Sequence, residues 1–119
     1  MNKFKSKVRG YYELNPTRYP VVASIAITQG LAFEGACEQT VSMVLEHQLG
    51  DPGAKLHLHF HGVRDLVVQQ PASSLISIGH VEILCGAEFP GIQSNYLVRD
   101  PEQERVLWFE CRDFDAYVE

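Results

Sequence analysis

Three histidines recur at alternate positions in the stretch LHLHFHGV, which covers residues 56–63. In an extended strand the side chains of residues i and i+2 lie on one face about 6.6 Å apart. His57 with His59, or His59 with His61, could therefore bind one metal ion. The outer two imidazoles would lie about 13 Å apart, which is too far for one coordination shell. A metal site here would need two adjacent histidines and a ligand from another strand.

That further ligand would have to come from a small set of side chains elsewhere in the chain. The candidates are His47, His80 and Glu82. Zinc or another divalent metal with an open position for water would then make a metal-binding domain or a metal-dependent hydrolase. The alternative is that the apolar residues between the histidines face the core, while the imidazoles face solvent or a partner. We favour this alternative, which predicts no cofactor, because spacing within one strand does not supply the third ligand.

The cysteines of the chain are odd in number and widely separated. Cys37, Cys85 and Cys111 stand among apolar neighbours, which argues against a disulfide framework and against a zinc knuckle. A catalytic thiol would need a nearby base in an electropositive setting, and the sequence does not show that His80 meets Cys85. We expect all three cysteines to be small buried hydrophobic residues.

Familiar catalytic motifs are missing from the sequence. It contains no Gly-x-Ser-x-Gly, no phosphate-binding Gly-rich loop, no Cys-x-x-Cys and no His-Glu-x-x-His. Glu110, Asp113 and Asp115 cluster around Arg112 in the manner of an acid pair, but without a group from a pocket they are typical of a solvated terminus. We therefore assign no catalytic residue and favour a protein without catalytic activity, while an enzyme stays open as the alternative.

Trp108 is the single tryptophan of the chain and a candidate anchor for a protein partner. It stands between Leu107 and Phe109 in an alternating segment, so its side chain points away from theirs. On an exposed face Trp108 would bind a partner together with the acidic Glu110 and Asp113. The alternative is that its ring lies in a second core layer or under a loop.

The charge of the chain is divided between a basic start and an acidic remainder. Residues 1–18 contain five basic residues and one acid, a net charge of +4. Residues 19–119 contain five basic residues and fourteen acids, a net charge of −9. This acidic body disfavours a nucleic acid partner, because phosphate binding needs a basic face. It suits a basic protein partner through electrostatic steering, although the same charge would also serve solubility alone.

The elements that must position these residues are mainly strands, because apolar and polar residues alternate with a period of two. In KFKSKVR the alternation with lysines predicts an edge strand, within a basic N-terminal arm over residues 1–18. The turn residues of LGDPGA indicate a reversal of the chain, which favours a strand over a helix for the segment before it. Three further strands are expected in PVVASIAIT, CEQTVSMVLEHQ and KLHLHFHGV.

The second half of the chain continues the pattern. LISIGHVEILC is expected as a strand with a bulge at Gly79. SNYLVRDPEQERVLWFECRDF is expected as a hairpin that turns at Asp100 and Pro101. The length of 119 residues suits a single globular domain over residues 1–119. The sequence therefore predicts a mainly β fold, an antiparallel β-sandwich or open barrel with room for one short helix.

Three stretches carry a resemblance to a known group of proteins. LHLHFHGVRDL, ISIGHVEIL and YLVRDPEQERVLWFECRDFDA resemble small, largely uncharacterised bacterial β-rich domains, including immunity-protein families of toxin systems. The resemblance spans roughly residues 40 to 115 and consists of strand rhythm and a few apolar positions. It implies a non-enzymatic protein that binds another protein, and it assigns no functional residue.

Two functions of different classes follow from these observations. The preferred function is a non-catalytic module that binds a basic protein partner and neither nucleic acid nor membrane. The alternative is a metal-binding domain or hydrolase built on His57, His59 and His61. No run of about 18 apolar residues occurs, and the basic N-terminus lacks the apolar segment of a secretory signal. We therefore expect a cytoplasmic protein.

Overall fold

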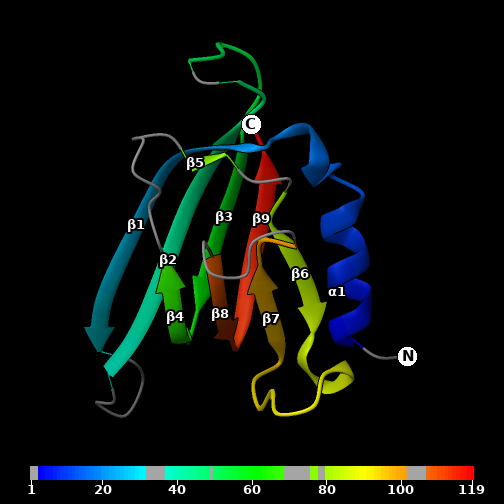
Figure 1. Cartoon of the computed structure of the whole chain (residues 1–119), viewed down its shortest axis with the longest axis vertical. Coiled ribbons are helices and arrows are strands. Elements are labelled where there is room, and N and C mark those ends of the chain that lie inside the picture. Colours follow the sequence, from blue (N-terminus) through cyan, green and yellow to red (C-terminus); the bar gives the residue numbers. More distant parts are fainter. Residues whose placement is uncertain (1–2, 32–36, 49, 69–75, 78–79, 102–106) are drawn as a thin grey trace.

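The computed structural model describes residues 3–31, 37–48, 50–68, 76–77, 80–101 and 107–119. These residues form two antiparallel sheets, whose buried residues share one core, and a helix that lies along one side of them (Figure 1). Both sheets are antiparallel and open, so the predicted mainly β fold, an antiparallel β-sandwich or open barrel, is confirmed. Within the described residues no helix is long and apolar enough to span a membrane.

The strands are divided unevenly between the sheets. The five-stranded sheet, in spatial order, contains β5 (Ile76–Ser77), β1 (Val21–Leu31), β2 (Cys37–Glu46), β3 (Leu56–His61) and β9 (Asp113–Val118). The four-stranded sheet contains β4 (Arg64–Val68), β8 (Leu107–Cys111), β7 (Tyr96–Arg99) and β6 (Glu82–Cys85). The helical elements are α1 (Lys3–Tyr12) and the short 3-10 helices η1 (Pro16–Arg18) and η3 (Gly86–Glu88).

The core lies between the two sheets and follows the alternation in the sequence. Alternate residues are buried in the second half of β2 (Val41, Met43 and Leu45) and throughout β3 (Leu56, Leu58 and Phe60), and opposite them lie buried residues of β6, β7 and β8. Phe60 of β3 meets Phe109 of β8 edge to face, with ring centroids 4.9 Å apart. Both side chains are fully buried, and burial of an aromatic or aliphatic side chain of this size contributes about 1.5–3 kcal/mol. The contact between the two rings ties one sheet to the other.

The predicted strands of the hairpins are confirmed. β2 and β3 pair antiparallel across the turn at LGDPGA, and β7 and β8 pair as the arms of the predicted hairpin. The prediction for LISIGHVEILC is wrong in one respect, because this stretch supplies β5 to one sheet and β6 to the other. A strand signal alone does not tell to which sheet a segment belongs. The bulge predicted at Gly79 lies outside the described residues.

The edge strand predicted for KFKSKVR is wrong, because these residues belong to α1. A period of two and a period of 3.6 both fit so short a stretch. The helical period also places Val8, Tyr11 and Tyr12 on the face that carries Phe4, and all four side chains pack against the core. Lysine and arginine are good helix formers, so the exposed positions favour the helix as well.

Two tyrosines fasten α1 to the sandwich. The hydroxyl of the buried Tyr11 donates a hydrogen bond to the carbonyl of Val81, 2.5 Å away, just before β6. The Tyr12 hydroxyl donates to the carbonyl of Ile83 and accepts from its N–H, both at 3.1 Å. The Tyr11 ring also meets Phe114 of β9 edge to face. The helix thus bridges an edge of each sheet.

Replacement of Tyr11 by Phe tests this attachment. The ring stays but the Val81 carbonyl loses its donor, so we expect the free energy of unfolding to fall by about 1–3 kcal/mol. Denaturant titrations followed by the fluorescence of the single tryptophan measure the change. The matched control is Tyr117→Phe, because Tyr117 is 40% exposed and its change should stay within about 0.5 kcal/mol. Equal effects of the two substitutions would contradict the attachment.

The Tyr11 hydroxyl also makes the stability of the folded protein depend on pH in the alkaline range. Burial raises the pKa of Tyr11 well above its usual value, so the folded protein holds this proton more tightly than the unfolded chain does. The stabilisation is complete below the ordinary tyrosine pKa of about 10 and is lost as pH rises through the folded value. Melting temperatures between pH 8 and pH 11 should fall less steeply in Tyr11→Phe than in the wild type. Burial also raises the pKa of Tyr12 and Tyr96, so part of the fall remains.

Candidate protein-binding face

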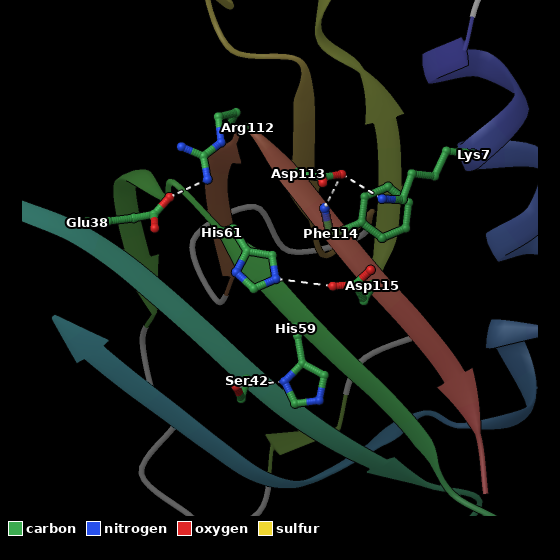
Figure 2. A network of polar contacts seen from close by, with 9 residues as sticks. All are labelled: Lys7, Glu38, Ser42, His59, His61, Arg112, Asp113, Phe114 and Asp115. Atoms are coloured by element: carbon green, nitrogen blue, oxygen red, sulfur yellow. Dashed lines mark hydrogen bonds and ion pairs between the residues drawn. The ribbon is translucent and has the colours of Figure 1, made fainter. Parts of the chain in front are cut away.

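The outer side of the five-stranded sheet gathers the polar and aromatic side chains that could serve a function. We call this surface the histidine face, and it consists of Ser42 from β2, His57, His59 and His61 from β3, and Asp113, Asp115 and Tyr117 from β9. It is opposite the core side of the same strands. Figure 2 shows most of these residues along the three neighbouring strands.

The alternation of β3 places the three imidazoles on this face. Leu56, Leu58 and Phe60 are fully buried, and the three histidines between them are half-buried. β3 lies between β2 and β9, so His57 and His59 have register neighbours on both strands, and His61 has one on β9. The interpretation of the LHLHFH stretch as a strand with apolar residues inward is confirmed.

Aromatic stacking orders one end of the histidine face. The ring of His57 lies parallel to that of Tyr117, with centroids 4.8 Å apart and an angle of 6°. His59 also stacks on Tyr117, at 6.1 Å and 22°. The Ser42 hydroxyl oxygen and Nδ1 of His59 are 3.0 Å apart, within hydrogen-bond distance. Each of these two imidazoles is therefore held in place by a neighbouring strand.

Polar and charged pairs hold the side chains at the other end of the histidine face. Nε2 of His61 is 3.2 Å from a carboxylate oxygen of Asp115, and the Lys7 ammonium is 2.6 Å from Asp113. Burial acts to raise the pKa of Asp113, but hydrogen bonds from Lys7 and from the Phe114 amide outweigh burial and lower it. Asp113 thus stays ionised at neutral pH. Beyond it, Arg112 pairs with Glu38 at 2.6 Å (Figure 2).

Ser42, His59 and Asp115 have the residue types of a hydrolytic triad, but their contacts differ from one. A triad needs a histidine base that contacts the nucleophile with one nitrogen and an orienting carboxylate with the other. Here Asp115 contacts His61 instead, although it is the register neighbour of His59. The arrangement does not prepare Ser42 as a nucleophile.

The candidate metal ligands are spread over the molecule. Nδ1 of His47 lies 3.1 Å from the carbonyl of Arg18. His80 packs against the ring of Tyr12, and Glu82 of β6 pairs with Arg99. Neither His80 nor Glu82 belongs to the sheet that carries the histidine row. Among the residues that the structure describes, no group of three or more His, Cys, Asp or Glu side chains is arranged to hold a metal ion.

Of the three residues predicted to bind a partner, Trp108 and Glu110 lie two residues apart on β8 of the four-stranded sheet, whereas Asp113 lies on β9 of the other sheet. Trp108 is half-buried in β8 of the four-stranded sheet. Glu110 is 7% exposed, and its carboxylate accepts hydrogen bonds from the backbone N–H groups of Gln93 and Ser94, each at 3.2 Å. These bonds hold the segment before β7. Only Asp113 joins the histidine face, and the roles of Trp108 and Glu110 in binding stay predictions.

Two members of the histidine face are absent from the sequence-based predictions. Ser42 lies on a correctly predicted strand, but it becomes relevant only when β2 and β3 pair. Tyr117 belongs to β9, a segment for which the sequence predicts a solvated terminus. The alternation of DFDAYV, with Phe114 buried and Asp113, Asp115 and Tyr117 outward, is the signal that predicts this strand.

No family model, curated protein or solved structure matches the chain. A proposal for its function therefore depends on the histidine face and on the charge distribution.

Replacement of His57, His59 and His61 together by Gln tests the metal alternative. No fully buried apolar side chain is removed, so folding should persist, and loss of the His57–Tyr117 stack should cost about 0.5–1.5 kcal/mol. Wild-type protein purified without an affinity tag or added metal should contain substoichiometric zinc, iron, nickel and manganese by elemental analysis. One equivalent of metal, absent from the triple variant, would reverse this expectation. Such a site would also make the melting temperature sensitive to chelator and to acid, because metal ligands must be deprotonated.

The thiols of Cys85 and Cys111 test the expectation that the cysteines are buried and unreactive. Burial raises the pKa of Cys111 to about 12 and also raises that of Cys85, so both stay as unreactive thiols at pH 8. In a Cys37→Ser background, which removes the one cysteine whose side chain lies outside the described residues, we expect a disulfide reagent to modify neither thiol within minutes. Both should react in denaturant. Fast modification of the native protein would show an accessible thiolate.

Proposed function

We propose that the chain is a cytoplasmic, non-catalytic protein-binding module that covers a basic partner with its histidine face. The observation that carries this proposal is the parallel stack of Tyr117 on His57, continued by His59, on the outside of a sheet. Aromatic side chains are enriched at the centres of protein interfaces. A sheet surface of this kind offers a partner a broad and rigid area.

The rings of the stack are already fixed in position, which favours a binding surface over a face that only contacts solvent. Ordering a flexible side chain on association costs about 0.5–1.5 kcal/mol. The rings of the histidine face are already positioned by each other and by Ser42, so a partner would meet side chains that have little freedom left to lose. Tyr117, which is 40% exposed, is the natural anchor.

The charge around the stack supports a basic partner. The side chains of Asp113 and Asp115 are 51% and 65% exposed, and the exposed Glu119 follows Tyr117 at the end of the chain. Lys7 offsets Asp113, whereas Asp115 pairs with His61. Exposed acids beside an aromatic centre form a rim that attracts positive charge and speeds association.

The immunity-type role is one form that this proposal takes. The strand rhythm of residues 40–115 resembles immunity proteins of bacterial toxin systems, and an acidic binding face suits the inhibition of a basic toxin by simple coverage. Such a protein acts without chemistry of its own. The absence of an assigned catalytic residue is compatible with that role.

Affinity capture with matched variants tests the proposal. The wild type is compared with Tyr117→Ala/Asp115→Asn and with Asp65→Asn, which removes an exposed acid from β4 in the other sheet. We expect one basic protein to be retained by the wild type and by Asp65→Asn. Retention should fall at least tenfold in the double variant. Retention should also decline as salt rises from about 0.05 to 0.5 M, because salt screens exposed charges.

Three outcomes would overturn the proposal. They are retention of an acidic partner that does not depend on salt, equal retention by the double variant, and tight binding to nucleic acid. Circular dichroism and melting temperature must first show that the double variant folds like the wild type. Tyr117→Phe is a further control, since it keeps the ring and should bind like the wild type.

A further inference from the structure

A groove lies between α1 and β9, at the margin of the histidine face. Its volume is about 510 Å³, which is in the usual range for a site that receives a small group. One wall is a face of α1 and of the turn after it, from Lys7 to Leu14, and the other wall is residues 114–117 of β9. Asp115 and Tyr117 belong both to the groove and to the histidine face, so the two surfaces are continuous.

The helical wall contains a glycine that the fold itself does not require. Gly10 has helical backbone and lies inside α1, where glycine destabilises a helix relative to alanine. A Cβ added to Gly10 would meet no atom of the described residues within 4 Å. Packing within the chain therefore does not explain the glycine. Close approach of another molecule to the backbone is a common reason for glycine, and Gly10 leaves room for it in the groove.

The strand wall turns one face of an aromatic ring toward the groove. His57 of β3 stacks parallel on the ring of Tyr117, with centroids 4.8 Å apart and an angle of 6°. β3 lies on one side of β9 and the groove on the other, so the ring face that His57 does not cover is directed toward the groove. The face of a tyrosine ring attracts cations, and the planar guanidinium of arginine also stacks on it.

A carboxylate lies beside this ring. Residues i and i+2 of a strand share a face about 6.6 Å apart, so Asp115 is within reach of a group stacked on Tyr117. Its Oδ2 is 3.2 Å from His61, while Oδ1 points away from that imidazole (Figure 2). Lys7 also lines the groove, but its ammonium is 2.6 Å from Asp113, which offsets its charge. Asp115 therefore makes the groove attractive to a cation.

We propose that the groove receives an arginine side chain of the basic partner. The guanidinium stacks on the open face of Tyr117 and pairs with Asp115, and the aliphatic stem packs over Gly10 against Leu14. This inference rests on the proposed function, because the groove adjoins the histidine face. It adds the side chain of the partner that this surface recognises.

Arginine fits the groove better than other side chains do. An acidic side chain would be repelled by Asp115, and an apolar one would cover this carboxylate without giving it a hydrogen bond. Lysine has the charge of arginine, but its compact and strongly hydrated ammonium neither stacks on a ring nor forms a bidentate pair with a carboxylate. The ring and the carboxylate together therefore favour the guanidinium.

Titration with N-acetyl-L-argininamide, followed by the amide chemical shifts of the protein in NMR, tests the groove directly. We expect a dissociation constant on the order of 1–10 mM, with the largest shifts at residues 10, 14 and 115–117. The matched compound N-acetyl-L-citrullinamide has nearly the same shape without the charge, so it should bind about fivefold more weakly or less. Equal binding of the two compounds, or shifts centred elsewhere, would contradict the inference.

Substitution of Gly10 separates the groove from the fold. Gly10→Leu fills the groove and should weaken binding of the arginine compound at least tenfold. The matched control Arg9→Leu adds the same side chain at an exposed position of α1 outside the groove, and it should bind at least as tightly as the wild type. Undiminished binding by a folded Gly10→Leu variant would overturn the inference.

Gly10→Ala tests whether the fold needs the glycine. Alanine favours the helix and its Cβ has space, so the melting temperature should rise by about 2–5 °C. A melting temperature below that of the wild type would show that glycine serves the fold, and the argument from Gly10 would fail.

Capture of the partner distinguishes failure of the groove from failure of the proposed function. Retention of the basic partner should fall at least tenfold in Gly10→Leu, whose histidine face is unchanged. Full retention by Gly10→Leu, together with loss in Tyr117→Ala/Asp115→Asn, would overturn the groove and leave the histidine face as the binding surface. Binding of the arginine compound without capture of any basic protein would support the arginine site and count against the proposed function.

Discussion

The register of β3 is the constraint on which the rest of the structure depends. A shift by one residue would move Leu56, Leu58 and Phe60 into water and three imidazoles into the core, so burial fixes the pairing of β3 with β2 and β9. The same register sets His57 beside Tyr117 and His59 beside Ser42. The histidine face is therefore a direct consequence of how the core is packed. Any substitution that disturbs Phe60 also disturbs the surface proposed to bind a partner.

The sequence predicts β3 and the arms of the β7–β8 hairpin from their alternation, and the outward direction of the histidines follows from it. The period of β2 fits a strand or a helix, and the turn residues after it decide for the strand. The sequence does not predict α1, because KFKSKVR fits either period and the edge of β6, some 70 residues away, decides between them. Nor does it predict the contact of His61 with Asp115, which requires the pairing of strands 54 residues apart. Local alternation of apolar and polar residues predicts most of the strands. Contacts between distant segments decide α1 and the arrangement of the histidine face.

The formal charge overstates how acidic the surface is. Glu46, Asp100 and Glu110 are buried, and the Glu110 carboxylate is taken up by backbone amides. Glu46 pairs with Lys55, and Glu82 with Arg99. Such acids hold turns and strands in place, and they attract little from outside. Among the described residues, the exposed acids Asp113, Asp115 and Glu119 lie on or next to β9, beside the aromatic rings, and Glu13, Asp65 and Glu88 are exposed elsewhere.

The attachment of α1 has a consequence for the order of folding. The helix precedes every strand in the chain, yet the groups that its tyrosines bond lie about 70 residues later. Lys7 contacts Asp113 at a separation of 106 residues. During synthesis the helix therefore leaves the ribosome long before its binding sites exist, and a ten-residue helix alone in water is marginal. The helix is made before the strands on which it docks, and until it docks, the edge of β6 is open to other chains.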